Sequence, residues 1–216
     1  KELKEPVLVT GAGGCIGSWV VALLVKENIP VVAFDLSQDT RRLKLLIDDS
    51  EIEKIKWITS DITDTKDVNN AIKDNNIQSI IHLAALQVPF CAADPINGAK
   101  VNVVGTVNIF EAVRQYNIKH LVYASSVAAH GLISKDMYMP TLYGAYKLCD
   151  ENIAHVYHQD WGVPSIGFRP GIAYGVGRDQ GMTSKTTVAI LAAASNQSYT
   201  IPFSGPISAL HVREVA

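Results

Sequence analysis

Residues 7–17 read Val7-Leu8-Val9-Thr10-Gly11-Ala12-Gly13-Gly14-Cys15-Ile16-Gly17, and the architecture of the chain follows from this run. Its first four residues favour a β-strand, its glycines favour a tight turn, and the residues after it have an apolar helical period. A pyrophosphate can approach a backbone this closely only where side chains are absent. The start of the helix then offers free N–H groups and a positive dipole end, so the run predicts a dinucleotide-binding turn.

A glycine-rich turn is a weak indicator by itself, because glycines also simply permit tight turns. The residues expected to contact the cofactor here are Gly11, Gly14, Cys15, Ile16 and Gly17. The rest of the chain supports this interpretation. Short runs rich in Val and Ile alternate with longer segments of helical period, which is typical of βαβ units and a parallel sheet.

The alternation predicts six strands, at Val7–Thr10, Val31–Asp35, Lys56–Thr59, Ser79–Leu83, His120–Ala124 and Ser165–Arg169. The expected helices are Ile16–Glu27, Thr40–Ile47, Thr65–Asn75, Ile96–Tyr116 and Tyr143–Trp161, followed by a helix over Thr183–Ala194 and a strand over Tyr199–Phe203. The fold class is therefore α/β, a Rossmann-like doubly wound parallel sheet. We expect residues 1–175 to form an NAD-binding domain and residues 176–216 to form a small, incomplete substrate-binding region.

The second strand ends in Asp35, 18 residues beyond Gly17. A carboxylate at this place accepts hydrogen bonds from the adenosine ribose and repels the extra phosphate of NADP, so NAD is the expected cofactor. Asp35 could instead be a solvated charge at a strand end. Arg41 and Arg42 follow closely and could in principle host a 2′-phosphate.

The composition argues against several classes of binding partner. The chain is 48% hydrophobic and 19% charged, with a net charge of -2, and no run of Lys and Arg suggests nucleic acid as a partner. No stretch reaches the roughly 18 apolar residues of a membrane span, and the charged run Lys1–Pro6 does not fit a signal peptide, so we expect a cytoplasmic protein without a membrane partner. Cys15, Cys91 and Cys149 are odd in number and widely spaced, which fits neither a disulfide framework nor a metal site.

Six motifs occur in an order that is typical of one family. They are Thr10-Gly11-x-x-Gly14-x-x-Gly17, Asp61-Ile62-Thr63-Asp64, His82-Leu83-Ala84-Ala85, Ser125-Ser126, Tyr143-x-x-x-Lys147, and Arg169-Pro170 with Tyr174-Gly175. With these motifs the chain resembles, over nearly its whole length, the extended short-chain dehydrogenase/reductase family, also called the NAD-dependent epimerase/dehydratase family.

The resemblance implies further contacts with NAD. They are Asp61 and Ile62 beside the adenine, Leu83, Ala84 and Ala85 along the cofactor groove, Asn102 in support of the active-site lysine, and Arg169 and Pro170. Each has an alternative. Asp61 could cap the helix that begins near Asp64, the small residues after His82 could serve packing alone, and Asn102 could make an ordinary helix hydrogen bond.

Tyr143 and Lys147 lie four residues apart in a helical segment and therefore share one face. A free tyrosine titrates near 10, so a catalytic phenol needs a fall of about three pKa units, or roughly 4 kcal/mol. An ammonium in bulk water supplies only about 1 kcal/mol, so the site must be partly desolvated and the oxidised nicotinamide must contribute. Tyr146 could be a tethered core tyrosine, as could Tyr143, but Tyr146 points about 100° away from Lys147.

Ser126 follows the fifth strand at the edge where ligands of open α/β sheets bind. We expect its hydroxyl to hold the substrate oxygen while Tyr143 removes the hydroxyl proton and Lys147 binds the nicotinamide ribose. Ser125 is the alternative partner of the substrate, because only one of two neighbouring residues faces the groove.

Several positions depart from the family pattern. Ile172 stands where nucleotide-sugar epimerases carry an Asn that contacts the substrate diphosphate, and His130 replaces an aromatic residue, where it could touch substrate or lie in a loop. The catalytic serine and tyrosine are unusually close in sequence, which suggests that a segment is absent near Ser134–Lys135. Arg178 lies in a loop on the substrate side, where it could bind a carboxylate or phosphate.

Three functions remain open. The leading one is an NAD-dependent dehydrogenase of a hydroxylated small molecule, such as a sugar, sugar acid or related polyol. The second is an epimerase of a sugar or nucleotide sugar, such as a UDP-hexose 4-epimerase, that retains its NAD. The third is a dinucleotide-binding protein without catalysis. The resemblance also implies a homodimer through the helices Ile96–Tyr116 and Tyr143–Trp161.

Overall fold

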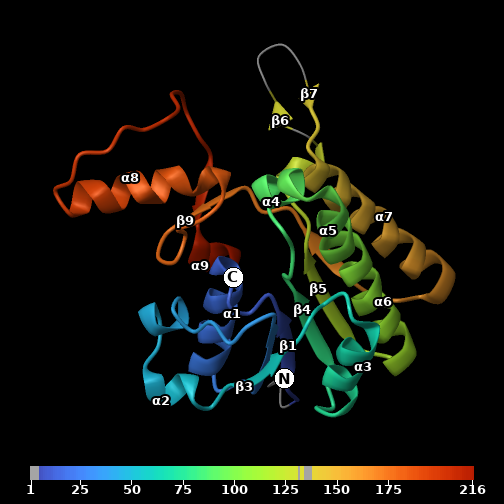
Figure 1. The fold of residues 1–216 in the computed structure, drawn as a ribbon. Coiled ribbons are helices and arrows are strands. Elements are labelled where there is room, and N and C mark those ends of the chain that lie inside the picture. The colour runs from blue at the N-terminus through green and yellow to red at the C-terminus, as the bar shows by residue number, and fades with distance from the viewer. Residues whose placement is uncertain (1–4, 131, 134–137) are drawn as a thin grey trace.

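The computed structural model describes residues 5–130, 132–133 and 138–216, and six parallel strands form its central sheet. The strands are β1 Val7–Thr10, β2 Val31–Asp35, β3 Lys56–Thr59, β4 Ser79–His82, β5 His120–Ala124 and β8 Ile166–Phe168. Their order in the sheet is β3-β2-β1-β4-β5-β8 (Figure 1). The direction of winding reverses between β1 and β4, as in a doubly wound sheet, which confirms the predicted fold class.

Helices cover both faces of the sheet (Figure 1). The main ones are α1 Cys15–Lys26, α3 Thr65–Lys73, α6 Gly105–Tyr116 and α7 Leu142–Trp161. Because side chains alternate along β1, Leu8 joins the core beneath α3, α6 and α7, whereas Val7 and Val9 join the core beneath α1. A buried core therefore packs on each face of the sheet and fixes the positions of the strand ends, from which the loops described below extend.

The single helix expected over Ile96–Tyr116 is interrupted. The structure has α4 Val88–Ala93, α5 Pro95–Ala99, a π-helical stretch η2 Lys100–Val104, and then α6. Inside the π-helical stretch, Asn102 turns its side-chain amide to the backbone of the loop after β4. A π-bulge of this kind is invisible in apolar periodicity and is frequent near functional sites.

Two further expectations were wrong in detail. The helix expected over Thr40–Ile47 is reduced to a 3₁₀ turn, η1 Leu43–Leu45, followed by α2 Asp49–Ile52. Asp48 and Glu51 form a capping box that starts the chain on a new helix, which ends the earlier one. The strand expected over Tyr199–Phe203 is irregular, and proline within it removes a ladder hydrogen bond.

The C-terminal region folds over the carboxyl ends of the strands (Figure 1). Here β9 Ile172–Tyr174 pairs in parallel with β10 Ala209–His211, across the expected domain boundary at residue 175. The remaining elements are η3 Val127–His130, β6 Leu132–Ile133, β7 Tyr138–Met139, η4 Met182–Ser184, α8 Lys185–Ala194 and α9 Val212–Val215. The segment suspected to be absent near Ser134–Lys135 lies outside the described residues. Among the described ranges, no helix has the length and apolar character to cross a bilayer.

Candidate active site

A cavity of about 800 Å³ opens at the carboxyl ends of the strands. Its walls contain the predicted residues Gly11, Gly14, Cys15, Ile16, Gly17, Asp35, Asp61, Ile62, Leu83, Ala84, Ala85, Ser125, Ser126, Tyr143, Lys147, Pro170 and Arg178. Asn102 and Arg169 are the two predicted residues that lie outside these walls. Residues from segments far apart in the sequence therefore meet in one space.

Two positions in the glycine turn leave no room for a side chain. A Cβ at Gly17 would lie 2.0 Å from the carbonyl oxygen of Gly11. Gly11 itself has a φ of +68°, and a Cβ there would lie 2.8 Å from the backbone nitrogen of Ala84. α1 begins directly after Gly14, with no side-chain cap over its first N–H groups. This bare cradle fits the pyrophosphate of NAD, whose oxygens need approach and N–H donors.

The carboxylate of Asp35 supports the glycine turn. Its Oδ2 accepts a hydrogen bond from Gly13 N at 2.9 Å, and its Oδ1 accepts one from Leu36 N at 2.8 Å. Asp35 also forms part of the cavity wall, where it was predicted to meet the adenosine ribose. The side chain is thus fixed by the backbone and is not a freely solvated charge.

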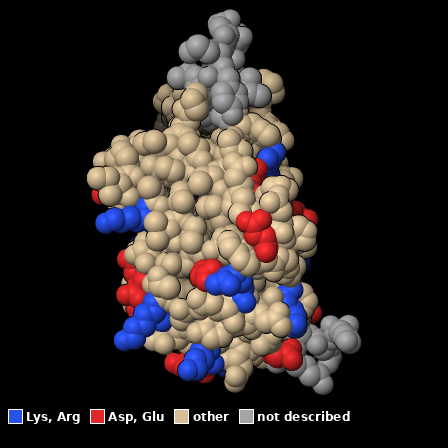
Figure 2. Space-filling model, turned by 90° about the vertical axis from the view of Figure 1, so that its right-hand side faces the viewer, with Lys and Arg blue, Asp and Glu red and all other residues tan. Residues whose placement is uncertain are grey.

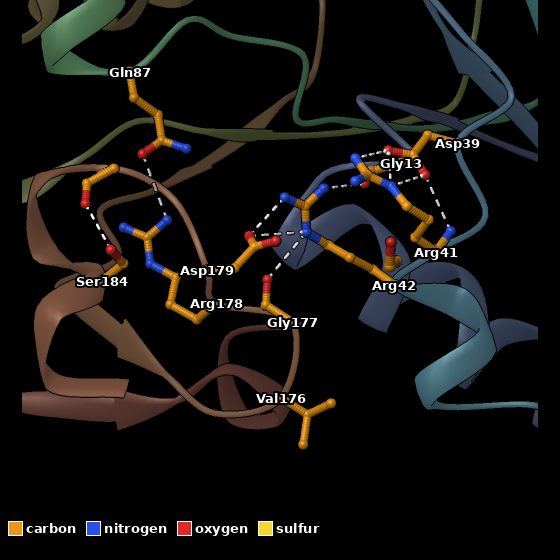
Figure 3. A network of polar contacts seen from close by, with 12 residues as sticks. Gly13, Asp39, Arg41, Arg42, Gln87, Val176, Gly177, Arg178, Asp179 and Ser184 are labelled. Carbon is orange, nitrogen blue, oxygen red and sulfur yellow. Dashed lines mark hydrogen bonds and ion pairs between the residues drawn. The ribbon is translucent and has the colours of Figure 1, made fainter. Parts of the chain in front are cut away.

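The two cations that could have hosted a 2′-phosphate are already paired (Figure 3). Arg41 forms an ion pair with Asp39 at 2.7 Å, and its hydrogen bonds lower the pKa of that carboxyl to about 2. Arg42 donates to a carbonyl oxygen of the glycine turn at 2.9 Å and to Gly177 O at 3.1 Å, and pairs with Asp179 at 2.6 Å. Neither guanidinium is available to a phosphate without breaking these contacts, which favours NAD over NADP.

Asp61 lines the cavity and is not the helix cap that it could have been. The cap of α3 is Asp64, whose side chain accepts hydrogen bonds from Lys66 N and Asp67 N. Asp61 instead accepts one from Thr63 N at 2.8 Å and faces the cavity.

A buried hydrogen-bonded chain runs behind the cofactor groove. Thr10 Oγ1 lies 2.7 Å from His82 Nδ1, and His82 Nε2 lies 3.1 Å from Thr106 Oγ1. Thr10 Oγ1 also accepts hydrogen bonds from the N–H groups of Leu83 and Ala84, so its own proton goes to His82. Burial lowers the pKa of His82 to about 3, so the ring is neutral and donates through Nε2. The residues after β4 are therefore held by hydrogen bonds as well as by packing.

Helix α7 brings Tyr143 to the turn that follows β5. Thr141 caps the helix, because its side chain accepts a hydrogen bond from Gly144 N at 3.0 Å. A Cβ at Gly144 would lie 2.2 Å from Ala128 O, so only glycine lets the helix approach η3 this closely. Ser126 lies just before η3 and accepts a hydrogen bond from Ala128 N at 3.1 Å. Backbone contact therefore holds the serine turn beside the tyrosine helix.

The other helical tyrosine is tethered elsewhere. Tyr146 donates its hydroxyl to Pro95 O at 2.9 Å, away from the cavity. Tyr143 and Lys147 share the cavity, as the helical spacing predicted. Lys147 Nζ lies 3.2 Å from Asp150 Oδ2. Sequence reasoning missed Asp150, although its i,i+3 spacing from the lysine could have revealed it.

Three predicted residues use their side chains to brace the cavity from behind. Ser125 donates its hydroxyl to Glu151, and Arg169 pairs with the same carboxylate through Nε at 2.6 Å and also contacts His130. Asn102 bonds both backbone groups of Leu86, at 2.7 and 2.9 Å. Their predicted contacts with cofactor or substrate remain predictions. Ser126 thus stays the better candidate to face a substrate, since the hydroxyl of Ser125 is engaged.

The far wall of the cavity carries a guanidinium without a carboxylate partner in the described part of the chain (Figure 3). Arg178 donates to Thr183 Oγ1 at 2.8 Å and lies 3.5 Å from Gln87 Oε1. Its Nε is buried and finds no hydrogen-bond partner among the described residues. Thr183 lies in the loop expected on the substrate side, whereas Gln87 is a cavity residue that sequence reasoning missed, since it belongs to no recognisable motif.

Fold and site together define a dinucleotide-binding protein with the serine, tyrosine and lysine of a short-chain dehydrogenase/reductase. The model of the NAD dependent epimerase/dehydratase family matches residues 7–215, and the chain belongs to this family. The resemblance predicted from the motifs is therefore confirmed. NAD is the cofactor of the family, whose members include NAD-dependent epimerases and dehydrogenases.

Relatives and solved structures agree with this assignment. The chain is 33% identical to the uncharacterized protein MJ1055 of Methanocaldococcus jannaschii, over 78% of this chain and 56% of that protein. A UDP-glucose 4-epimerase of Lactobacillus helveticus is 35% identical over 60% of this chain and 38% of its own length. The UDP-glucose 4-epimerase of Thermus thermophilus, solved in complex with NAD, superposes with a TM-score of 0.81 at 25% identity, over 97% of this chain and 71% of that one. The chain thus spans little more than half of the Methanocaldococcus jannaschii protein and less than half of the Lactobacillus helveticus epimerase.

Proposed function

We propose that the protein is an NAD-dependent oxidoreductase that moves a hydride between NAD and the secondary alcohol carbon of a hydroxylated small molecule. The observation that carries the proposal is the meeting of Ser126, Tyr143 and Lys147 with the glycine cradle in one cavity. NAD, when bound there, supplies the acceptor or donor of the hydride.

In this proposal each part of the site has a defined task. The cradle of Gly11, Gly14 and Gly17 receives the pyrophosphate, and Asp35 accepts hydrogen bonds from the adenosine ribose. Ser126 holds the substrate hydroxyl, while Tyr143 Oη takes its proton as the alcohol is oxidised and returns it on reduction. Lys147 Nζ favours the ionised phenol through its charge and binds the nicotinamide ribose.

The substrate class follows from the far wall. Arg178 offers a charged donor without a carboxylate partner among the described residues, which suits a carboxylate or phosphate group on the substrate. Ile172 lines the same cavity and offers no polar group for a diphosphate. We therefore favour a sugar acid or a comparable anionic polyol over a nucleotide sugar.

The decisive experiment is a panel of sugars, sugar acids and nucleotide sugars with NAD, followed by NADH absorbance and product analysis. Net NADH with an anionic polyol supports a dehydrogenase. An epimerised product without net NADH supports the second candidate, which the UDP-glucose 4-epimerases among the similar proteins favour. NAD binding without turnover of any compound would leave only a non-catalytic binding protein.

Arg178→Gln is expected to raise KM for the anionic substrate by about 10-fold or more, because a charge-assisted hydrogen bond to an anion contributes roughly 1.5–3 kcal/mol. The dissociation constant of NAD should stay within about threefold of wild type. The exposed Arg213→Gln variant controls for the loss of one positive charge. A weakened NAD affinity with an unchanged KM would show that Arg178 serves the cofactor instead.

We also propose a homodimer through α6 and α7. Figure 2 views the molecule from this side, where a wide area lacks charged side chains. A groove on it is lined by Val107, Cys149, Asn152, Ile153, Val156, Tyr157 and Trp161. Light scattering should give twice the mass of the chain, and Val156→Asp, which places a charge on this face, should give the single mass. A wild-type monomer would contradict the dimer.

The division at residue 175 and cytoplasmic residence also remain proposals. The central sheet ends with β8, seven residues before this boundary, while β9 and β10 pair across it. The three cysteines, all free in the structure, support cytoplasmic residence, because a reducing compartment keeps thiols free.

A further inference from the structure

The carboxyl group of Asp150 has no task in the function proposed above, although it lies beside the active-site lysine. Asp150 Oδ2 is 3.2 Å from Lys147 Nζ, and the two side chains are 1% and 4% exposed. Their i,i+3 spacing on α7 turns both groups to the same side of the helix. Lys147 lines the cavity, whereas Asp150 lies behind it.

Asp150 is incompletely satisfied by its surroundings. Its Oδ1 is buried and finds no hydrogen-bond partner among the described residues. The hydroxyl of Thr106 nearby is already donated to Asn102 O at 2.6 Å. Burial raises the pKa of Asp150 to about 6, against the opposing effects of the Lys147 ammonium and, after it, of the neighbouring Thr106 hydroxyl. A carboxylate in such a place is costly unless its charge compensates another one, and the ammonium is the charge it meets.

We propose that Asp150 is a positioning residue that holds the Lys147 ammonium and thereby sets the pH range in which Lys147 and Tyr143 carry the protons that the reaction needs. This inference rests on the proposed function, because it uses the roles given there to Tyr143 and Lys147.

The direction of the effect follows from the sign of the charge. A carboxylate favours the protonated forms of neighbouring groups, so both an ammonium and a phenol keep their protons up to higher pH. Asp150→Asn removes the charge and keeps the shape. The phenol then ionises, and the ammonium is lost, at lower pH. In a plot of kcat/KM against pH, both the acidic limb and the alkaline limb therefore move to lower pH.

The other titratable groups around the pair do not obscure this effect. Those that act on Lys147 or Asp150 in the described residues are His82, Cys91, Tyr123, Cys149 and Glu151. Burial keeps His82 neutral and raises the pKa of both thiols and, to about 12, that of Tyr123. The hydrogen bond from Arg169 lowers the pKa of Glu151. None of them changes charge between about pH 6 and pH 9, by these directions.

The first measurement is the pH profile of kcat/KM, with the substrate found by the panel. We expect the alkaline limb of Asp150→Asn to lie about one pH unit or more below that of wild type, as for the loss of a charge within 4–6 Å of the Lys147 ammonium, and the acidic limb to move in the same direction. Below about pH 6 the two profiles should converge, because the wild-type carboxyl is then protonated. Asp150→Glu should restore the position of the limbs.

The matched control is Asp160→Asn, which removes an exposed carboxylate from the same helix and should leave the profile in place. A uniform loss of activity in Asp150→Asn, with both limbs unmoved, would mean a merely structural role and would overturn the inference. A shift toward alkaline pH would overturn it as well.

The second measurement needs no turnover. The tyrosinate absorbance of the protein without NAD is titrated with and without Tyr143→Phe, so that the difference reports the phenol of Tyr143 alone. This phenol should ionise at lower pH in Asp150→Asn than in wild type, and an unchanged titration refutes the inference. If Asp150→Asn does not fold, Asp150→Ser is titrated instead. If the titration of Tyr143 moves to lower pH in Asp150→Asn but the wild-type protein turns over no substrate, the proposed function is wrong and the coupling of Asp150 to this site is still supported.

Discussion

Tyr143→Phe should lower kcat by roughly 10²- to 10⁴-fold, which is the usual contribution of a positioned proton-transfer group. The change removes one oxygen from the cavity wall and leaves the ring, so the packing of α7 is kept. Binding of NAD should stay within about threefold of wild type, because the cradle for the pyrophosphate lies on β1 and α1. Steady-state kinetics with the substrate found by the panel, and a calorimetric titration with NAD, measure both quantities.

Tyr146→Phe is the matched control on the same helix. It removes the hydroxyl that donates to Pro95 O outside the cavity. We expect near-normal kcat and a loss of about 1 kcal/mol in the free energy of unfolding, the usual net contribution of one hydrogen bond. Near-normal turnover in a folded Tyr143→Phe protein would remove the phenol from the mechanism.

Gly17→Ala should weaken NAD binding by roughly 10- to 100-fold. The added Cβ would lie 2.0 Å from Gly11 O, and both partners are backbone, so either the turn or the start of α1 must move. Overpacking of this kind costs about 1–3 kcal/mol, and each 1.4 kcal/mol is a factor of ten in affinity. Because the cradle moves with the turn, part of this cost should fall on cofactor binding and part on the melting temperature.

Gly171→Ala is the steric control, since a Cβ there would meet no atom within 4 Å. Its melting temperature should match wild type. Because Gly171 lines the cavity, this variant controls for stability alone. If Gly17→Ala bound NAD as wild type does, the dinucleotide would not lie over the turn, and the cofactor contacts assigned to it would be wrong.

The parts of the fold that depend on strong local signals could be predicted from sequence. The central strands are short runs of β-branched residues buried on both faces, so their positions followed from composition and from their alternation with helical segments. The helix over Thr40–Ile47 failed because the apolar spacing there records the burial of Leu43 and Ile47, not continuous helical hydrogen bonding. Apolar periodicity indicates which side chains are buried. It says little about whether the backbone forms the i→i+4 hydrogen bonds of an α-helix or the i→i+3 hydrogen bonds of a 3₁₀ helix.

The site divides in a similar way. Tyr143, Lys147 and Ser126 belong to motifs with fixed spacing, and the structure brings them to one cavity. Asp150 and Gln87 were missed because their importance comes from what tertiary packing sets beside them, a buried ammonium and a guanidinium. The hydroxyl of Ser125 and the guanidinium of Arg169 were assigned to ligands, yet both meet Glu151, a residue that no motif singled out.

The close approach of Gly144 to Ala128 has a bearing on how tolerant this protein can be of change. The separation between the serine loop and the tyrosine is set where two stretches of main chain touch, so it does not depend on the length or shape of any side chain. Substitutions on the outer surface of α7 can therefore accumulate without altering the separation between Ser126 and Tyr143. A methyl group at position 144 is not tolerated in the same way, because it would push α7 away from the backbone of Ala128.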